Sequence, residues 1–128
     1  MEALLSNTSE EQKDIMITIH DNNVRGNDLM IPINSLLYIE AQKNNVSVCY
    51  TKDGKPITIE VHTTLTTVIE ELKDYQNIFQ CHRSFVVNVN NITSAKGNSN
   101  GYQLTLGPCM NSIPVSRSYV AQLKSFIA

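Results

Sequence analysis

Apolar and polar residues alternate in short segments along most of this chain, and turn-forming residues separate the segments. Successive segments begin roughly eight to twelve residues apart, a spacing typical of antiparallel β-structure. Asp53-Gly54 between two of them is a strong hairpin signal, because both central residues of the favoured tight turn need positive φ. The predicted strands are residues 15–20, 29–33, 37–41, 46–51, 57–61, 78–80, 85–89, 92–96, 102–106 and 112–115.

Two segments have the periodicity of amphipathic helices instead. The first follows Thr63-Thr64, which can cap its start, and the second follows Pro114-Val115-Ser116, with Ser116 as candidate N-cap and Arg117 in the first turn. Their inward positions are Leu65, Val68, Ile69 and Leu72 in the first helix, and Val120, Leu123, Phe126 and Ile127 in the second.

The composition is that of one folded domain. With 128 residues and 41% hydrophobic content, the chain can bury a single modest core, to which we assign Tyr38, Phe79, Phe85 and Phe126. Residues 1–14 are polar and acidic and indicate a linker or a frayed N-terminal segment. Because neither a membrane-spanning run nor a signal peptide is visible, we expect a cytoplasmic domain, although its parent protein could be membrane-tethered.

The cysteines offer little chemistry. Cys49, Cys81 and Cys109 are odd in number and lack a C-x-x-C pair, which argues against zinc and against a disulfide framework, and three thiols fit a reducing cytoplasm. Cys81-His82 could pair a nucleophile with a base, but neighbours flanking a strand usually point to opposite sides, and no orienting acid follows. We therefore expect no catalytic residue, metal, cofactor or small-molecule substrate, and no enzyme activity.

The charge is unevenly distributed along the chain. The net charge of −2 combines six basic and twelve acidic residues in positions 1–75 with four basic and no acidic residues in positions 76–128. The second part is also rich in Asn, Ser, Thr and Gln, which, like Arg and Lys, contact phosphate backbones. This distribution favours a nucleic-acid surface, while a mildly basic solvated face that binds another partner remains an alternative.

One motif in this acid-free part has the chemistry of a DNA contact. His82, Arg83 and Ser84 precede a predicted strand that starts near Phe85 and runs to about Asn90. An arginine on a short lead-in to a strand is held rigidly, and its planar fork can reach a phosphate or the O6/N7 edge of guanine.

Four motifs follow one another along the chain. They are Ile31-Pro32 with Leu36-Leu37-Tyr38-Ile39-Glu40-Ala41 and Lys43-Asn44-Asn45-Val46, the helix around residues 65–72, Phe79 with His82-Arg83-Ser84-Phe85-Val86-Val87-Asn88, and Pro114-Val115-Ser116-Arg117-Ser118-Tyr119. Taken together, these motifs resemble the LytTR-type DNA-binding domain, the output module of many bacterial response regulators. The resemblance covers about residues 15–127 and predicts a LytTR-like domain over residues 15–128. It implies a mostly β, elongated fold of about ten short strands in small antiparallel sheets with two short helices.

This resemblance implies sequence-specific binding to double-stranded DNA through loops placed in successive major grooves, on paired direct repeats and with possible self-association on DNA. Which of the two asparagines in the first loop points at DNA is left open. The implied base contacts are Asn44, Asn45, Arg83 and Arg117, and the implied phosphate contacts are Lys43, Ser84, Lys96, Ser116 and Ser118.

Several residues have structural alternatives. Arg83 could pair with Glu40 or Glu60, and Arg117 could stack on Tyr119 or cover apolar surface with its stem. His82 could shape the loop as a packed, hydrogen-bonded histidine, and Asn88 is better explained as a partner for buried backbone groups at a bend than as a base contact. The rival function is a β-rich protein-interaction or ligand-sensing module that holds an acidic partner.

Overall fold

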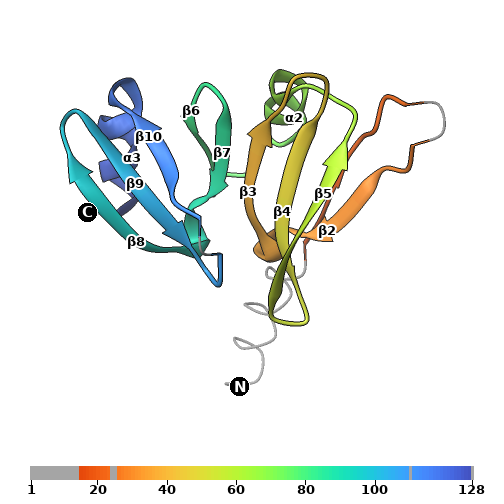
Figure 1. Cartoon of the computed structure of the whole chain (residues 1–128), viewed down its shortest axis with the longest axis horizontal. Helices are drawn as coiled ribbons and strands as arrows, with labels where there is room; N and C mark the ends of the chain where they lie inside the picture. The colour runs from red at the N-terminus through yellow and green to blue at the C-terminus, as the bar shows by residue number, and fades with distance from the viewer. Residues whose placement is uncertain (1–14, 24–25, 110, 128) are drawn as a thin grey trace, which may run out of the picture.

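The computed structural model describes residues 15–23, 26–109 and 111–127, so the expected linker at residues 1–14 lies outside the described residues. Ten strands in three antiparallel sheets, two α-helices and three 3-10 turns make up the described part (Figure 1). The predicted mostly β fold is confirmed. The elements are β1 (Met16–Ile19), β2 (Leu29–Pro32), η1 (Ile33–Ser35), β3 (Leu36–Ala41), β4 (Val46–Lys52), β5 (Lys55–Val61), α2 (Leu65–Glu71), β6 (Ile78–His82), β7 (Phe85–Asn88), η2 (Val89–Asn91), β8 (Ile92–Asn98), β9 (Gly101–Leu106), β10 (Ile113–Ser116), η3 (Arg117–Tyr119) and α3 (Val120–Ile127).

The sheets follow the chain in order. β1 and β2 form a two-stranded ribbon, the five-stranded sheet has the order β5-β4-β3-β7-β6, and β10-β9-β8 form the third sheet. Each of the ten predicted strands is present within a few residues of its predicted ends. The Asp53-Gly54 turn also forms as predicted, with φ of 55° and 80°, and it sets Lys52 opposite Lys55.

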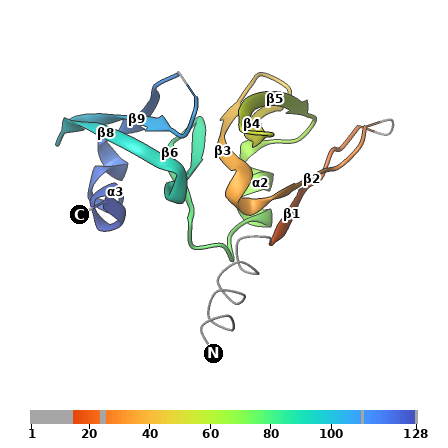
Figure 2. The same cartoon turned by 90° about the horizontal axis from the view of Figure 1, so that it is seen from below.

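The five-stranded sheet is buried on both faces at its centre. Val86 and Val87 are neighbours on β7 and are both fully buried, but they belong to different apolar clusters. The first cluster joins this sheet to the β1–β2 ribbon and α2, and the second joins it to β9, β10 and α3 (Figure 2). Both faces of this strand are therefore buried, because it lies between two apolar layers.

Asn88 ends β7 in the interior, with no exposed surface. Its Nδ2 donates to the carbonyl oxygen of Ile33 at 2.9 Å, and its Oδ1 accepts from Asn90 N–H at 3.0 Å and from Asn77 Nδ2 at 3.0 Å. The structural interpretation of Asn88 is confirmed. Because the side chain closes the bend at η2, the strand stops at Asn88 rather than near Asn90.

The first predicted helix is confirmed, and the second differs from its prediction at both ends. Thr64 caps α2 by accepting from Thr67 N–H at 3.1 Å. Ser116 makes no such cap bond, because a 3-10 turn that starts at Arg117 precedes α3. Phe126 and Ile127 are 39% and 41% exposed, so their predicted inward placement is wrong. The last turn of α3 borders two open grooves, and the ring of Phe126 contacts that of Phe79 at a centroid distance of 5.2 Å.

Candidate nucleic-acid interface

Two turns meet at one end of the five-stranded sheet, the upper end in Figure 1. The β3–β4 turn is closed by Gln42 N–H, which donates to the carbonyl oxygen of Asn45 at 2.8 Å. The β6–β7 turn consists of Arg83 and Ser84, and the Ser84 carbonyl oxygen accepts from Ala41 N–H at 2.8 Å. The backbone thus places the two predicted contact loops side by side, although they lie about forty residues apart in the sequence.

An open groove of about 470 Å³ lies between these turns and the start of α2. Its lining residues include a lysine, an arginine, amides and threonine hydroxyls, and none of them is acidic. Such side chains bind phosphates and base edges. The lining is formed by residues 41–45 and 63–66 and by Arg83, which brings the predicted residues Lys43, Asn44, Asn45 and Arg83 together.

His82 fixes the shape of the turn that carries Arg83. Its Nδ1 accepts a hydrogen bond from Ser84 N–H at 3.1 Å, and its ring lies edge-on to Phe85 at a centroid distance of 5.7 Å. Accepting through Nδ1 places the proton of the neutral ring on Nε2. His82 is therefore the packed, hydrogen-bonded histidine of the structural interpretation.

Arg83 itself is exposed. Within the described parts of the chain, neither Arg83 nor Arg117 takes part in an ion pair, so the suggested pairing of Arg83 with Glu40 or Glu60 is not formed. A guanidinium without a carboxylate partner keeps its full charge available to an incoming phosphate or guanine. Among the described residues, Lys73 forms an ion pair with Glu70. The contacts of His20 with Asp28 and Glu71, and of His62 with Asp21, are ion pairs when the imidazole is protonated.

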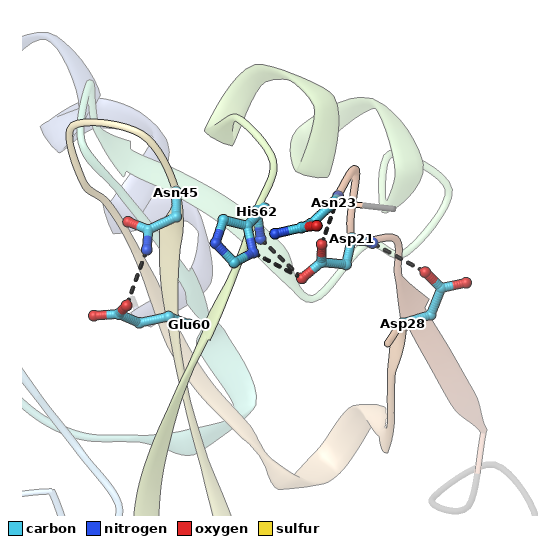
Figure 3. Close-up of polar contacts among 6 residues, drawn as sticks. All are labelled: Asp21, Asn23, Asp28, Asn45, Glu60 and His62. Atoms are coloured by element: carbon cyan, nitrogen blue, oxygen red, sulfur yellow. Dashed lines mark hydrogen bonds and ion pairs between the residues drawn. The ribbon is translucent and has the colours of Figure 1, made fainter. Parts of the chain in front are cut away.

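The two asparagines of the β3–β4 turn have different surroundings. Asn45 Nδ2 donates to Glu60 Oε1 at 3.0 Å, from the turn to the neighbouring strand β5 (Figure 3). Asn44 lines both the groove beside Arg83 and a second groove next to Asn22, Asn23 and His62. Sequence reasoning missed Glu60 as a partner of Asn45, because it considered Glu60 only as a partner for Arg83.

Asp21 ties the β1–β2 ribbon to the end of β5, close to this second groove (Figure 3). Its carboxylate, 6% exposed, accepts from Asn23 N–H at 2.7 Å, from His62 N–H at 3.1 Å and from His62 Nδ1 at 3.2 Å. These donors, above all the backbone N–H of His62, hold the pKa of Asp21 below its ordinary value of 3.8. The sequence showed Asp21 only as part of a turn, with no sign of its distant partner.

Arg117 lies outside the groove, at the start of η3. Arg117 and Ser118 are exposed and Ser116 is half-buried. β10, which leads to them, runs beside β6, where the Cys81 thiol donates to the carbonyl oxygen of Pro114 at 3.5 Å. Lys96 is exposed on β8, opposite Gln103, so the structure does not bring it or the η3 residues into the groove with Arg83.

Cys81 lies on β6, just before the turn of Arg83, and is fully buried. Burial raises the pKa of its thiol to about 12, so the thiolate that a nucleophile requires is essentially absent at neutral pH. Among the described residues, no group of three or more His, Cys, Asp or Glu side chains is arranged to hold a metal ion.

A mostly β domain with cationic and amide side chains on adjoining turns is a candidate nucleic-acid-binding module. The family of the LytTr DNA-binding domain matches residues 26–128, and the chain belongs to this family. The resemblance is confirmed, and the matched residues form a domain of the DNA-binding class.

A solved structure shares the fold. It is the LytTr DNA-binding domain of a putative methyl-accepting/DNA response regulator from Bacillus cereus, with a TM-score of 0.67 and 23% identity, over 88% of this chain and 97% of that one. The search of curated proteins gave no match. Within the described residues, every helix is too short or too polar to cross a membrane.

Proposed function

We propose that this chain is the sequence-specific, double-stranded DNA-binding output domain of a bacterial transcription regulator, and that its turns read the major groove. The observation that carries the proposal is the joining of the β3–β4 and β6–β7 turns by the Ala41–Ser84 hydrogen bond, which gathers Lys43, Asn44, Asn45 and Arg83 around one acid-free groove. Membership of the LytTr DNA-binding domain family supports DNA as the partner.

The proposed roles follow from side-chain chemistry. Arg83 and Arg117 offer forked donors to guanine, and an asparagine amide offers a donor and an acceptor to adenine. Lysine and serine side chains suit phosphates, which position the domain without carrying sequence information. We assign base contacts to Arg83, Arg117 and the pair Asn44 and Asn45, and phosphate contacts to Lys43, Ser84, Lys96, Ser116 and Ser118.

Arg83 and Arg117 belong to different parts of the surface. Arg83 lies in the groove beside the five-stranded sheet, and Arg117 lies at the end of β10 in the three-stranded sheet. The β6–β7 turn and the end of β10 both lie along the upper side of the molecule in Figure 1. A duplex running along this side would meet the two arginines at separate base positions.

We also propose that residues 15–128 form the DNA-binding unit and that this unit works in the cytoplasm without cofactor or catalysis. Paired direct repeats are the proposed DNA target, with two copies of the domain bound next to each other on the duplex.

The test is selection of bound duplexes from a randomised DNA pool by the purified chain, compared with the Arg83→Ala/Arg117→Ala variant. We expect the wild type to select duplexes that share a sequence motif, and the variant to select no such motif. Enrichment of no sequence by the wild type would contradict it and would favour the rival module for an acidic partner, since such a surface has no reason to prefer one duplex over another.

A further inference from the structure

A carboxylate lies unexpectedly close to the proposed DNA-reading turn. Glu60 is exposed on β5 opposite Ser47 of β4, and its Oε1 accepts from Asn45 Nδ2 at 3.0 Å (Figure 3). A negative charge at this place repels the phosphates that the groove is otherwise suited to attract. Its presence therefore calls for a role other than raising affinity.

The chemistry of the contact fixes the orientation of the asparagine. An asparagine amide has two ends of nearly equal shape, one a donor and one an acceptor. A carboxylate only accepts, so Asn45 must turn its NH₂ end toward Glu60, because the reverse orientation would place Oδ1 against a carboxylate oxygen. Glu60 thus selects one of the two orientations of the amide.

In the selected orientation, the Asn45 amide keeps one donor and one acceptor for a ligand. Glu60 takes one of the two amide hydrogens, and the second hydrogen and Oδ1 remain for a ligand. One N–H and one carbonyl oxygen are the pair that binds adenine N7 and N6. The Asn45 backbone is held as well, since its carbonyl oxygen closes the turn with Gln42 N–H at 2.8 Å. Such preorganisation lowers the entropy that binding costs.

We propose that Glu60 is a positioning residue of the DNA-reading surface, which orients the Asn45 amide so that Asn45, rather than Asn44, reads a base. Its charge at the same time weakens the attraction of the groove for the phosphates of every duplex, and a duplex with this base regains affinity through the oriented amide. This inference rests on the proposed function and assigns a role within it.

The key variant is Glu60→Gln, which keeps the size of the side chain. Glutamine can accept or donate, so both orientations of Asn45 become allowed and the charge is lost. In selection from a randomised duplex pool, we expect preference at one base position to fall about fivefold, the worth of one net hydrogen bond. Affinity for random duplex should rise at the same time.

Two further variants separate positioning from charge. Asp53→Asn removes the same charge at the β4–β5 turn, at the opposite end of the sheet, where asparagine tolerates the φ of 55°. It should leave every base preference unchanged. Asn45→Ala should lose preference at the same position as Glu60→Gln, and the double variant should lose no more than Asn45→Ala alone. Thermal unfolding of each variant checks that the fold is kept.

The outcomes are distinguishable. If the wild type selects no motif, the proposed function is overturned and this inference with it. If the wild type selects a motif and Glu60→Gln keeps the full preference at the Asn45 position, only the role of Glu60 is wrong. Preference lost at a position that Asn45→Ala leaves unchanged would mean that Glu60 touches DNA itself, which also overturns the positioning role.

Discussion

The two arginines of the proposed surface are held in place by different means. The turn of Arg83 is fixed by hydrogen bonds, from Ala41 N–H to the Ser84 carbonyl oxygen at 2.8 Å and from Ser84 N–H to His82 Nδ1 at 3.1 Å. Arg117 starts a 3-10 turn whose backbone bond runs from Val120 N–H to the Arg117 carbonyl oxygen, and Ser116 adds no side-chain cap bond. Val120 and Leu123 of α3 anchor this turn in the second apolar cluster. The comparison teaches that a side-chain hydrogen bond strengthens the turn at the Arg83 end, whereas the turn at the Arg117 end is anchored by helix packing in an apolar cluster.

The largest effects should come from breaking each apolar cluster separately. Leu123 on α3 and Leu72 at the end of α2 are both almost fully buried, in different clusters. Leu123→Ala and Leu72→Ala should each lower the free energy of unfolding by about 2 to 5 kcal/mol, because each leaves a cavity. Urea denaturation followed by circular dichroism measures this loss.

DNA binding by these two variants, measured at a temperature where both are folded, tests the comparison itself. Leu123→Ala should reduce base preference at the Arg117 position and leave the Arg83 position intact. Leu72→Ala should leave the Arg117 position intact. Equal loss at both positions in both variants would show that the two ends of the surface are not independent.

The next largest effect is expected from the arginines themselves. Arg83→Ala and Arg117→Ala should each cost about 1 to 3 kcal/mol at the cognate site and relax specificity at different base positions. Fluorescence anisotropy titrations against single-base variants of the selected site measure both quantities. Lys124→Ala in α3 removes a positive charge outside the proposed contacts and serves as control. Unchanged cognate affinity for Arg83→Ala would refute its assignment.

A smaller effect is expected at His82. His82→Ala removes the acceptor for Ser84 N–H, so cognate affinity should fall by about 1 kcal/mol as the turn of Arg83 loosens. His82→Asn, whose side-chain oxygen can accept the same bond, should restore part of the loss. The hydrogen bond and the ring contact of the His82 side chain are with Ser84 and Phe85, both outside η3. Specificity at the Arg117 position should therefore stay as in the wild type, and a loss there would count against the division into two ends.

The sequence predicted the fold well because its alternation is local. All ten strands, the Asp53-Gly54 turn and the capped helix α2 follow from residues close to one another in the chain. Predictions from local patterns failed where burial depends on elements that are distant in the sequence. Burial of β7 on both faces and the exposure of Phe126 depend on which elements lie beside them in three dimensions.

The candidate site was predictable in part for the same reason. The turn residues Asn44, Asn45 and Arg83 stand in recognisable motifs, and the structure places them around one groove. Their supporting partners come from far along the chain. Asn45 and Glu60 are 15 residues apart, and Asp21 and His62 are 41 residues apart, so only strand pairing and ribbon docking bring them together.

The smallest expected effect is a local loss of stability in acid, confined to the part of the chain that carries acidic residues. All twelve acidic residues of the chain lie in positions 1–75, so acid protonates side-chain carboxylates in that part of the chain and none in β6 to β10 or α3. The pKa of Asp21 is lowered by the donors that bind it, above all the backbone N–H of His62. The stability that Asp21 contributes is therefore present above pH 3.8 and is lost as pH falls through its lowered pKa.

Amide hydrogen–deuterium exchange across an acid series measures this local loss. After correction for the intrinsic pH dependence of exchange, the amides of Asn23 and His62, which donate to Asp21, should lose protection as pH falls through the lowered pKa of Asp21. In Asp21→Asn these amides should be less protected at neutral pH and should show little further loss on acidification. Amides of Leu104 and Val115 in the acid-free sheet should keep their protection in both proteins, because no side-chain carboxylate in positions 76–128 can be protonated beside them. If all four amides lost protection at the same pH, acid would unfold the domain as one unit. The hydrogen bonds of Asp21 would then add no local stability to the turn after β1.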